Sequence, residues 1–130
     1  MRLRLTSIIV AEQNQAERFD RGVLGLIKKQ DFPVGEFRWL SVVAPDGPEE
    51  FELSLEPNAH PGAQASQQAM RESGIPLAAF EPDDLAADFA RLSSKGVVFT
   101  LEPTDAGQVS IAMFEDTCGN LIQIYQHKRD

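Results

Sequence analysis

The sequence has few of the residues from which reactive and cross-linked sites are most often built. Its 130 residues include one cysteine, Cys118, and two histidines, His60 and His127. A single cysteine excludes an intramolecular disulfide, and two histidines cannot form a His-rich metal site. Positive charge is also scarce: 12 Lys and Arg stand against 20 Asp and Glu, which gives a net charge of -8. This balance repels phosphate backbones and anionic lipid surfaces, so we expect neither nucleic acid nor a membrane as a partner.

Several sequence signals are absent. No apolar stretch approaches the ~20 residues of a membrane span, and the N-terminal segment does not resemble a cleavable signal. There is no Gly-rich phosphate loop, G-x-S-x-G, C-x-x-C or H-E-x-x-H motif, which sets aside the enzyme classes that depend on them. The length and these absences together predict a single-domain cytoplasmic protein.

A C-terminal hairpin is the clearest local pattern. Two β-rich runs, Val109–Glu115 and Leu121–Gln126, flank a polar segment in which Gly119 is suited to a left-handed turn position. Strand alternation places Leu121, Gln123 and Tyr125 on one face and Ile122, Ile124 and Gln126 on the other. The face with the amide and the phenol is the one that we expect to line a pocket, although a solvated surface hairpin fits the pattern equally well.

The rest of the chain predicts the same order of elements twice. Helices are expected from about Ala16 to a stop at Gly25, over Ala63–Glu72 and over Leu85–Lys95, the last starting after Asp83 and Asp84. The other expected strands are Leu3–Ala11, Leu26–Phe32, Phe37–Ala44, Phe51–Glu56, Ile75–Glu81 and Val97–Glu102. An offset of 70 residues places Ala16 on Ala86, Phe19 on Phe89 and Arg21 on Arg91. We therefore predict one domain with a βαβββ half over residues 1–57, a connector over 58–74 and a second βαβββ half over 75–127.

Three segments carry recognisable patterns: Val10–Gly25, Asp83–Val97 and the F-E-D-T-C-G-N-L-I-Q-I run at Phe114–Ile124. Together they resemble the vicinal oxygen chelate superfamily, which includes glyoxalase I, bleomycin-resistance proteins and extradiol dioxygenases. The resemblance implies an α+β fold in which paired βαβββ modules form curled mixed sheets around a concave cavity. It also implies a ligand on the concave side and a homodimer.

The same resemblance implies where a divalent ion would be held in metal-dependent members. Those positions are Leu5 and Leu77 on the first strand of each half, and Glu52 and Gln123 on the last strand. Leucine supplies no donor atom, whereas a divalent ion wants three or more N or O donors from protein. We therefore expect no metal and no other cofactor, with a divalent metal retained only in an enzymatic alternative.

Other candidate site residues follow from strand alternation. Arg38 and Trp39 are neighbours on one strand, so one of them faces the cavity, to pair with a carboxylate or to stack on a planar ligand. Glu52 and Glu56 share a face but lie roughly 13 Å apart at ~3.3 Å per residue, too far to act on one bond. One of them, with its pKa raised in an apolar cavity, would be the catalytic residue if there is one. His60 and Cys118 are interpreted as a loop residue and a structural turn residue.

These observations favour a metal-independent protein that binds a small organic molecule, in the manner of bleomycin-resistance proteins. The expected contacts are Glu52, Gln123, Tyr125 and either Trp39 or Arg38, with Leu5, Leu77 and Ile9 as an apolar wall. The alternative is a divalent-metal-dependent lyase or isomerase of glyoxalase type, or a dioxygenase. A third hypothesis is a structural dimer whose cavity is filled by its own side chains.

Overall fold

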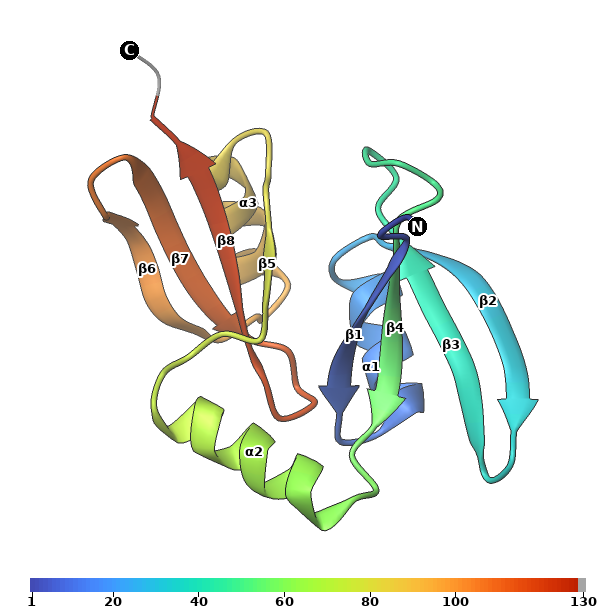
Figure 1. Ribbon diagram of the computed structural model, residues 1–130. Coiled ribbons are helices and arrows are strands. Elements are labelled where there is room, and N and C mark those ends of the chain that lie inside the picture. The colour runs from blue at the N-terminus through green and yellow to red at the C-terminus, as the bar shows by residue number, and fades with distance from the viewer. Residues whose placement is uncertain (129–130) are drawn as a thin grey trace. The chain divides into compact units, whose positions relative to one another are not determined.

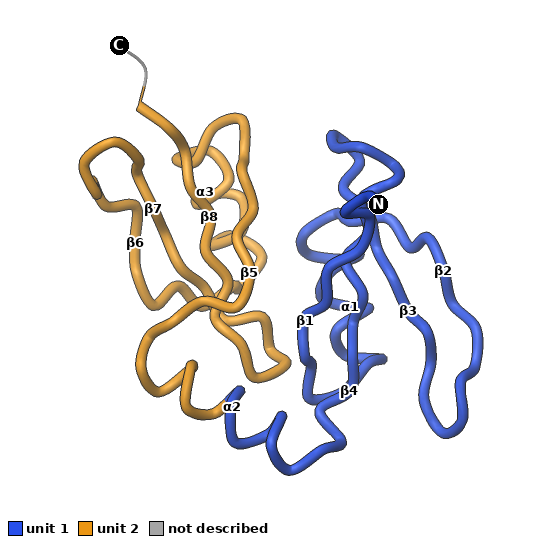
Figure 2. Tube along the Cα trace, viewed as in Figure 1, with its two compact units in different colours: residues 1–67 blue, residues 68–130 orange. Residues whose placement is uncertain are grey.

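The computed structural model describes residues 1–128, which divide into two compact units (Figure 2). The first unit is Met1–Gln67 and the second begins at Gln68, so the division lies inside one helix, α2 (Pro61–Glu72), in the expected connector. No helix of residues 1–128 is long and apolar enough to cross a membrane. The two units are described separately below.

The first unit is a βαβββ module. Its elements are β1 (Leu5–Val10), α1 (Gln13–Gly22), β2 (Ile27–Val34), β3 (Phe37–Val43) and β4 (Glu52–Pro57). The strands form one mixed sheet in the order β1-β4-β3-β2, in which β1 and β4 are parallel and the other pairs are antiparallel. Helix α1 lies behind this sheet (Figure 1) and buries Ala16 and Phe19, while Ile8, Leu40 and Leu55 are the buried strand residues of the core. One face of the sheet is thus covered by its own helix.

The second unit repeats this topology. It contains β5 (Ala78–Phe80), α3 (Leu85–Ser94), β6 (Phe99–Asp105), β7 (Val109–Glu115) and β8 (Leu121–His127). The strand order is β5-β8-β7-β6, again with a parallel first pair. Asp84 caps α3 by accepting a hydrogen bond from the Ala87 N–H, as its position in the sequence predicts. The matching order in the two units confirms the expected α+β fold with paired βαβββ modules.

The C-terminal hairpin folds as predicted. The buried Asp116 carboxylate accepts hydrogen bonds from the backbone N–H groups of Cys118 and Asn120 at 2.7 and 3.0 Å and from the Asn120 side chain at 2.8 Å. Gly119 has a φ of 94°, the left-handed conformation that glycine adopts cheaply. These bonds fix the register of β8 against β7, with Gln123 opposite Met113.

Several predicted boundaries were wrong. We expected Pro33 and Pro103 to end their strands, but β2 continues to Val34 and β6 to Asp105. Both are edge strands, where the N–H that proline lacks is not needed for pairing. Helix α1 ends at Gly22 rather than near Gly25, and β5 is shorter than predicted. The expected turn over residues 57–62 already contains the first residues of α2, which starts at Pro61, because proline is well suited to the first helical position.

Candidate binding face

The strand register defines a second, uncovered face on the sheet of the first unit. Residues paired directly across a sheet point to the same side. Ser7 pairs with Ser54, Ser54 with Ser41, and Ser41 with Gln30, so a polar row crosses all four strands. Alternation adds the residues two positions away on each strand, which are Leu5, Ile9, Phe32, Trp39, Val43, Glu52 and Glu56. We call this set the open face of the first sheet.

Two carboxylates of the open face are held by neutral donors. The Ser41 hydroxyl and the Gln30 side-chain amide each donate to Glu52 Oε1 at 2.6 Å. The Ser54 hydroxyl donates to Glu56 Oε1 at 2.9 Å. Because Ser41 and Ser54 face each other, the two glutamates lean from opposite directions toward one central pair of buried serines.

Hydrogen bonding also fixes the charge of Glu52. The Ser41 hydroxyl, and then the Gln30 amide, lower the pKa of Glu52 below its usual value. Hydrogen bonds donated to a carboxylate stabilise its charged form, so Glu52 is ionised at neutral pH. Within residues 1–128, no Lys or Arg forms an ion pair with Glu52 or Glu56.

An exposed aromatic pair lies beside these carboxylates. Phe32 on β2 and Trp39 on β3 are directly opposite each other, and their rings stack with centroids 5.7 Å apart and planes 7° apart. They are 46% and 42% exposed, and the next pair along the hairpin, Val34 and Phe37, is also exposed. Since large aromatic side chains normally bury most of their surface, a stacked pair left half in solvent is suited to contact with a ligand or partner.

Arg38 lies on the opposite face, against α1. Its guanidinium pairs with Glu17 of α1 and with Asp31 of β2, the latter at 3.0 Å, and it also donates to the Asn14 side chain. Arg38, and to a smaller extent Lys28, lower the pKa of Asp31 to about 2. The sequence left open whether Arg38 or Trp39 faces the cavity, and the structure places Trp39 on the open face.

Gln13, the first residue of α1, bridges β3 and β4 where the two strands diverge. Its amide nitrogen donates to the carbonyls of Arg38 and Leu55 at 2.7 and 2.9 Å, and its oxygen accepts from the Arg38 N–H at 3.1 Å. Direct pairing of β3 with β4 covers only Ser41 with Ser54 and Val42 with Leu53. The buried side chain of Gln13 therefore satisfies backbone groups where the strands diverge, on the side toward Trp39.

The second unit has an uncovered face of its own. Gln123 and Tyr125 lie on it, half-buried, opposite Met113 and Ile111 of β7. Arg71 at the end of α2 pairs with Glu115, and both line a hollow of about 310 Å³ whose apolar lining includes Leu101, Met113 and Leu121. The Tyr125 ring meets His127 edge-on at 5.7 Å. This face thus has an edge-on ring pair where the open face of the first sheet has a parallel stacked pair.

Sequence reasoning missed several residues of the open face. Phe32, Gln30 and the serines were not singled out, although the shared alternation of Ser7, Ser41 and Ser54 was a usable signal once the strands were aligned. Gln13 had no such signal, because nothing local predicts a side chain that replaces a strand pairing. Of the remaining candidates, His60 is exposed and accepts a hydrogen bond from the Gly62 N–H at the start of α2, and Cys118 is buried in the β7–β8 turn.

Comparison with known families agrees with this architecture. Residues 2–124 match the model of the glyoxalase/bleomycin resistance protein/dioxygenase superfamily. The chain belongs to this superfamily. The chain is also 48% identical over 126 residues to the uncharacterised protein YurT of Bacillus subtilis, an alignment that covers 97% of this chain and 99% of YurT.

Two solved structures are similar to this chain in fold and sequence. The crystal structure of UcmS2 is 28% identical with a TM-score of 0.82, and the match covers 96% of this chain and 97% of UcmS2. TnmS3, an antibiotic binding protein from Streptomyces sp. CB03234, is 30% identical with a TM-score of 0.77, over 98% of this chain and 97% of TnmS3. The similarity therefore covers both units.

The residues present do not fit the divalent ion that metal-dependent superfamily members hold. Leu5 pairs with Glu52, and in the second unit Ala79 pairs with Gln123, while Leu77 lies two positions earlier and donates its N–H to the Leu121 carbonyl. Neither pair offers more than one carboxylate or one neutral amide. Residues 1–128 contain no group of three or more His, Cys, Asp or Glu side chains arranged to hold a metal. Glu52 instead receives its hydrogen bonds from Ser41 and Gln30.

Proposed function

We propose that this protein binds a small organic molecule on the open face of the first sheet, without a metal ion, and releases it chemically unchanged. The stacked and half-exposed Phe32–Trp39 pair is the observation that carries the proposal. A planar ligand stacked on Trp39 would cover apolar surface that the fold leaves in water.

The surroundings of the aromatic pair support a binding role. The Ser41 and Ser54 hydroxyls are buried and already engaged by Glu52 and Glu56, so this part of the face is preorganised before any ligand arrives. A rigid polar patch next to an apolar platform is the usual composition of a small-molecule site. The antibiotic binding described for the similar protein TnmS3 is consistent with this role.

Metal-assisted lyase, isomerase or dioxygenase chemistry is the less favoured alternative. It would need donors at the positions of Leu5 and Leu77, where the side chains are aliphatic. Glu52 is also a poor general base, because hydrogen bonds hold its pKa low, while an efficient base has a pKa near the working pH. We therefore assign the open face to binding rather than to turnover.

The proposal is tested by a compound screen with two readouts on chelator-treated protein. Aromatic natural products are first ranked by the rise in melting temperature that they cause, since a ligand of the folded state stabilises it. Each hit is then incubated with the protein and recovered for mass spectrometry. We expect stabilising compounds to be recovered intact. A compound that is converted by the chelator-treated protein would contradict binding without turnover, and a broad screen without any hit would favour the structural-dimer hypothesis.

Two parts of the proposal rest on the sequence and the superfamily rather than on the open face. We infer that the protein acts as a homodimer and that it works in the cytoplasm. Light scattering on the purified chain tests the first inference, and a mass near that of one 14.4 kDa chain would contradict it. Fractionation of the producing cells tests the second.

A further inference from the structure

We propose that the ligand of the open face is a flat aromatic molecule that carries a protonated amine. This inference rests on the proposed function and adds the charge and shape of the ligand to it. The platform for the flat part is the Phe32–Trp39 pair, and the partner for the amine is the carboxylate of Glu52, with Glu56 beside the same serines.

Within residues 1–128, Glu52 and Glu56 have no ion-pair partner, and Lys29 acts on Glu52 only by a coulombic effect, the smallest of the influences on the pKa of Glu52. Glu52 accepts from a hydroxyl and an amide, and Glu56 accepts from the hydroxyls of Ser54 and Ser7. Neutral donors hold a carboxylate in place without cancelling its charge. A ligand that brings a cation to this point would complete an ion pair whose acidic half is already oriented.

Three basic side chains near the open face have partners elsewhere. Arg38 and Lys28 lie on the face that α1 covers, where they pair with Glu17 and Asp31. The Lys29 ammonium donates to the Glu49 carbonyl at 2.7 Å. An anionic ligand would therefore meet two carboxylates, while Arg38, Lys28 and Lys29 already have other partners, so the face selects against it.

The carboxylate and the rings are close enough for one small molecule to touch both. Trp39 and Ser41 are alternate residues on β3, roughly 6.6 Å apart at ~3.3 Å per residue. Because the Ser41 hydroxyl donates to Glu52 Oε1 at 2.6 Å, the Glu52 carboxylate lies beside Ser41, two residues along β3 from Trp39. An amine on a short arm of a ring stacked at Trp39 spans this separation. The negative face of the indole adds attraction for the same cation.

Three compounds that share one ring system test the inference: 1-pyrenemethylamine, 1-pyrenemethanol and 1-pyrenecarboxylic acid, which are cationic, neutral and anionic at pH 7. Each is titrated into the full chain by calorimetry at low and moderate salt. We expect the amine to bind at least about tenfold more tightly than the alcohol, and the acid to bind most weakly.

Glu52→Gln should lower the affinity for the amine to near that for the alcohol, while the affinity for the alcohol stays unchanged. Glu81→Gln, which removes one charge from an exposed position of the second unit, is the control and should leave all three affinities unchanged.

The outcomes separate this inference from the proposed function. Equal affinities for the three compounds, tightest binding of the acid, or equal weakening by Glu52→Gln and Glu81→Gln would overturn the ligand class and leave small-molecule binding intact. So would a screen that yields stabilising compounds when the pyrene amine does not bind. If no pyrene compound binds and the screen has no hit, both proposals fail. Should Glu52→Gln not fold, Glu56→Gln gives the same comparison, with a smaller expected loss for the amine.

Discussion

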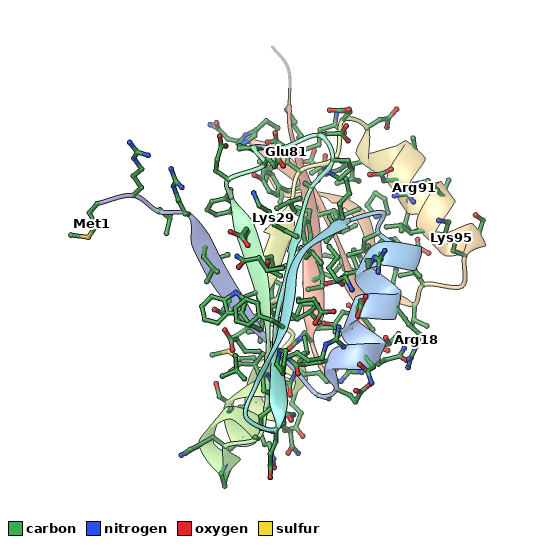
Figure 3. All side chains as sticks on the ribbon, turned by 90° about the vertical axis from the view of Figure 1, so that its right-hand side faces the viewer. Met1, Arg18, Lys29, Glu81, Arg91 and Lys95 are labelled. Atoms are coloured by element: carbon green, nitrogen blue, oxygen red, sulfur yellow. The ribbon has the colours of Figure 1, made fainter. Side chains whose placement is uncertain are left out.

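Trp39 stacks on Phe32 across the β2–β3 hairpin with the two ring planes 7° from parallel, and 42% of Trp39 remains exposed. Its neighbour Arg38 points to the other side of the same strand and is tied to α1 and β2 by ion pairs. Two consecutive residues of β3 thus lie on opposite faces: Trp39 on the face that we propose binds the ligand, and Arg38 on the face that α1 covers. Figure 3 shows the side chains of this unit, with Arg18 projecting from α1 away from the sheet.

This arrangement predicts opposite consequences for two adjacent alanine substitutions. Trp39→Ala should reduce the affinity for 1-pyrenemethanol at least about tenfold, with a loss of about 1 kcal/mol in unfolding free energy, because a half-exposed ring contributes more to a ligand than to the core. Arg38→Ala should leave the affinity unchanged and lower the unfolding free energy by about 1–2 kcal/mol, since it breaks a partly exposed network. Calorimetry and urea unfolding measure the two effects. If Arg38→Ala lowered the affinity while Trp39→Ala left it unchanged, the ligand would bind on the face that α1 covers, and the proposed site would be wrong.

Acid should lower the stability of the first unit, because Asp31 becomes protonated and loses its ion pairs. The pKa of Asp31 is about 2 in the folded protein and 3.8 in its ordinary state, so its contribution to stability is complete above about pH 4 and is lost as the pH falls through about 2. Asp31→Asn should therefore be less stable than the parent protein at pH 6, and its stability should fall less between pH 4 and pH 2. Urea midpoints over this range provide the measurement. Arg38→Gln should flatten the same part of the curve, because Arg38 is the main cause of the low pKa; an unchanged acid limb in both variants would contradict the assignment.

The turn between β7 and β8 should be the most sensitive loop of the second unit. Asp116→Ala removes the acceptor for two buried backbone N–H groups and the Asn120 amide, which we expect to cost about 3 kcal/mol of unfolding free energy. Asp105 makes a similar turn bond to the Gly107 N–H, but it is exposed. Asp105→Ala is therefore the matched control, with an expected cost below about 1 kcal/mol because water replaces the lost acceptor. Similar costs for the two variants would contradict the role of burial.

Gln13 should contribute more to the free energy of unfolding than expected for a polar residue at the start of a helix. Gln13→Ala removes the side chain that bonds the Arg38 N–H and two carbonyls. We therefore expect the unfolding free energy, measured with urea, to fall by about 2–3 kcal/mol. Gln15→Ala, two residues later in α1, removes a half-buried amide that accepts from Arg18 at the surface, and it should change stability by less than about 1 kcal/mol. If both variants are equally stable, Gln13 does not hold the divergent strands.

Local features of the fold could be predicted from the sequence, whereas features that depend on pairing between distant strands could not. The hairpin around Gly119 and the cap at Asp84 follow from short-range turn and helix-start chemistry, and both were predicted. Pro33 and Pro103 misled the strand boundaries, because tolerance of proline depends on edge position, which no local pattern reveals. Strand alternation put Arg38 and Trp39 on opposite faces but could not tell which face α1 covers. The serine row and Gln13 depend on pairing between distant strands, so they emerged only with the register.

The central claim is that a ligand binds at the open face of the first sheet without a metal ion, and Trp39, the one tryptophan of the chain, reports on that face directly. The most direct measurement is a fluorescence titration of chelator-treated protein with a compound that stabilises it, repeated after addition of Zn²⁺, Ni²⁺, Fe²⁺ or Mn²⁺, with the metal content of the sample determined in parallel. We predict a saturable change in Trp39 emission, with the same dissociation constant in metal-free and metal-supplemented protein. Binding that leaves Trp39 emission unchanged, or that disappears with the chelator and returns with a stoichiometric metal, would contradict the claim.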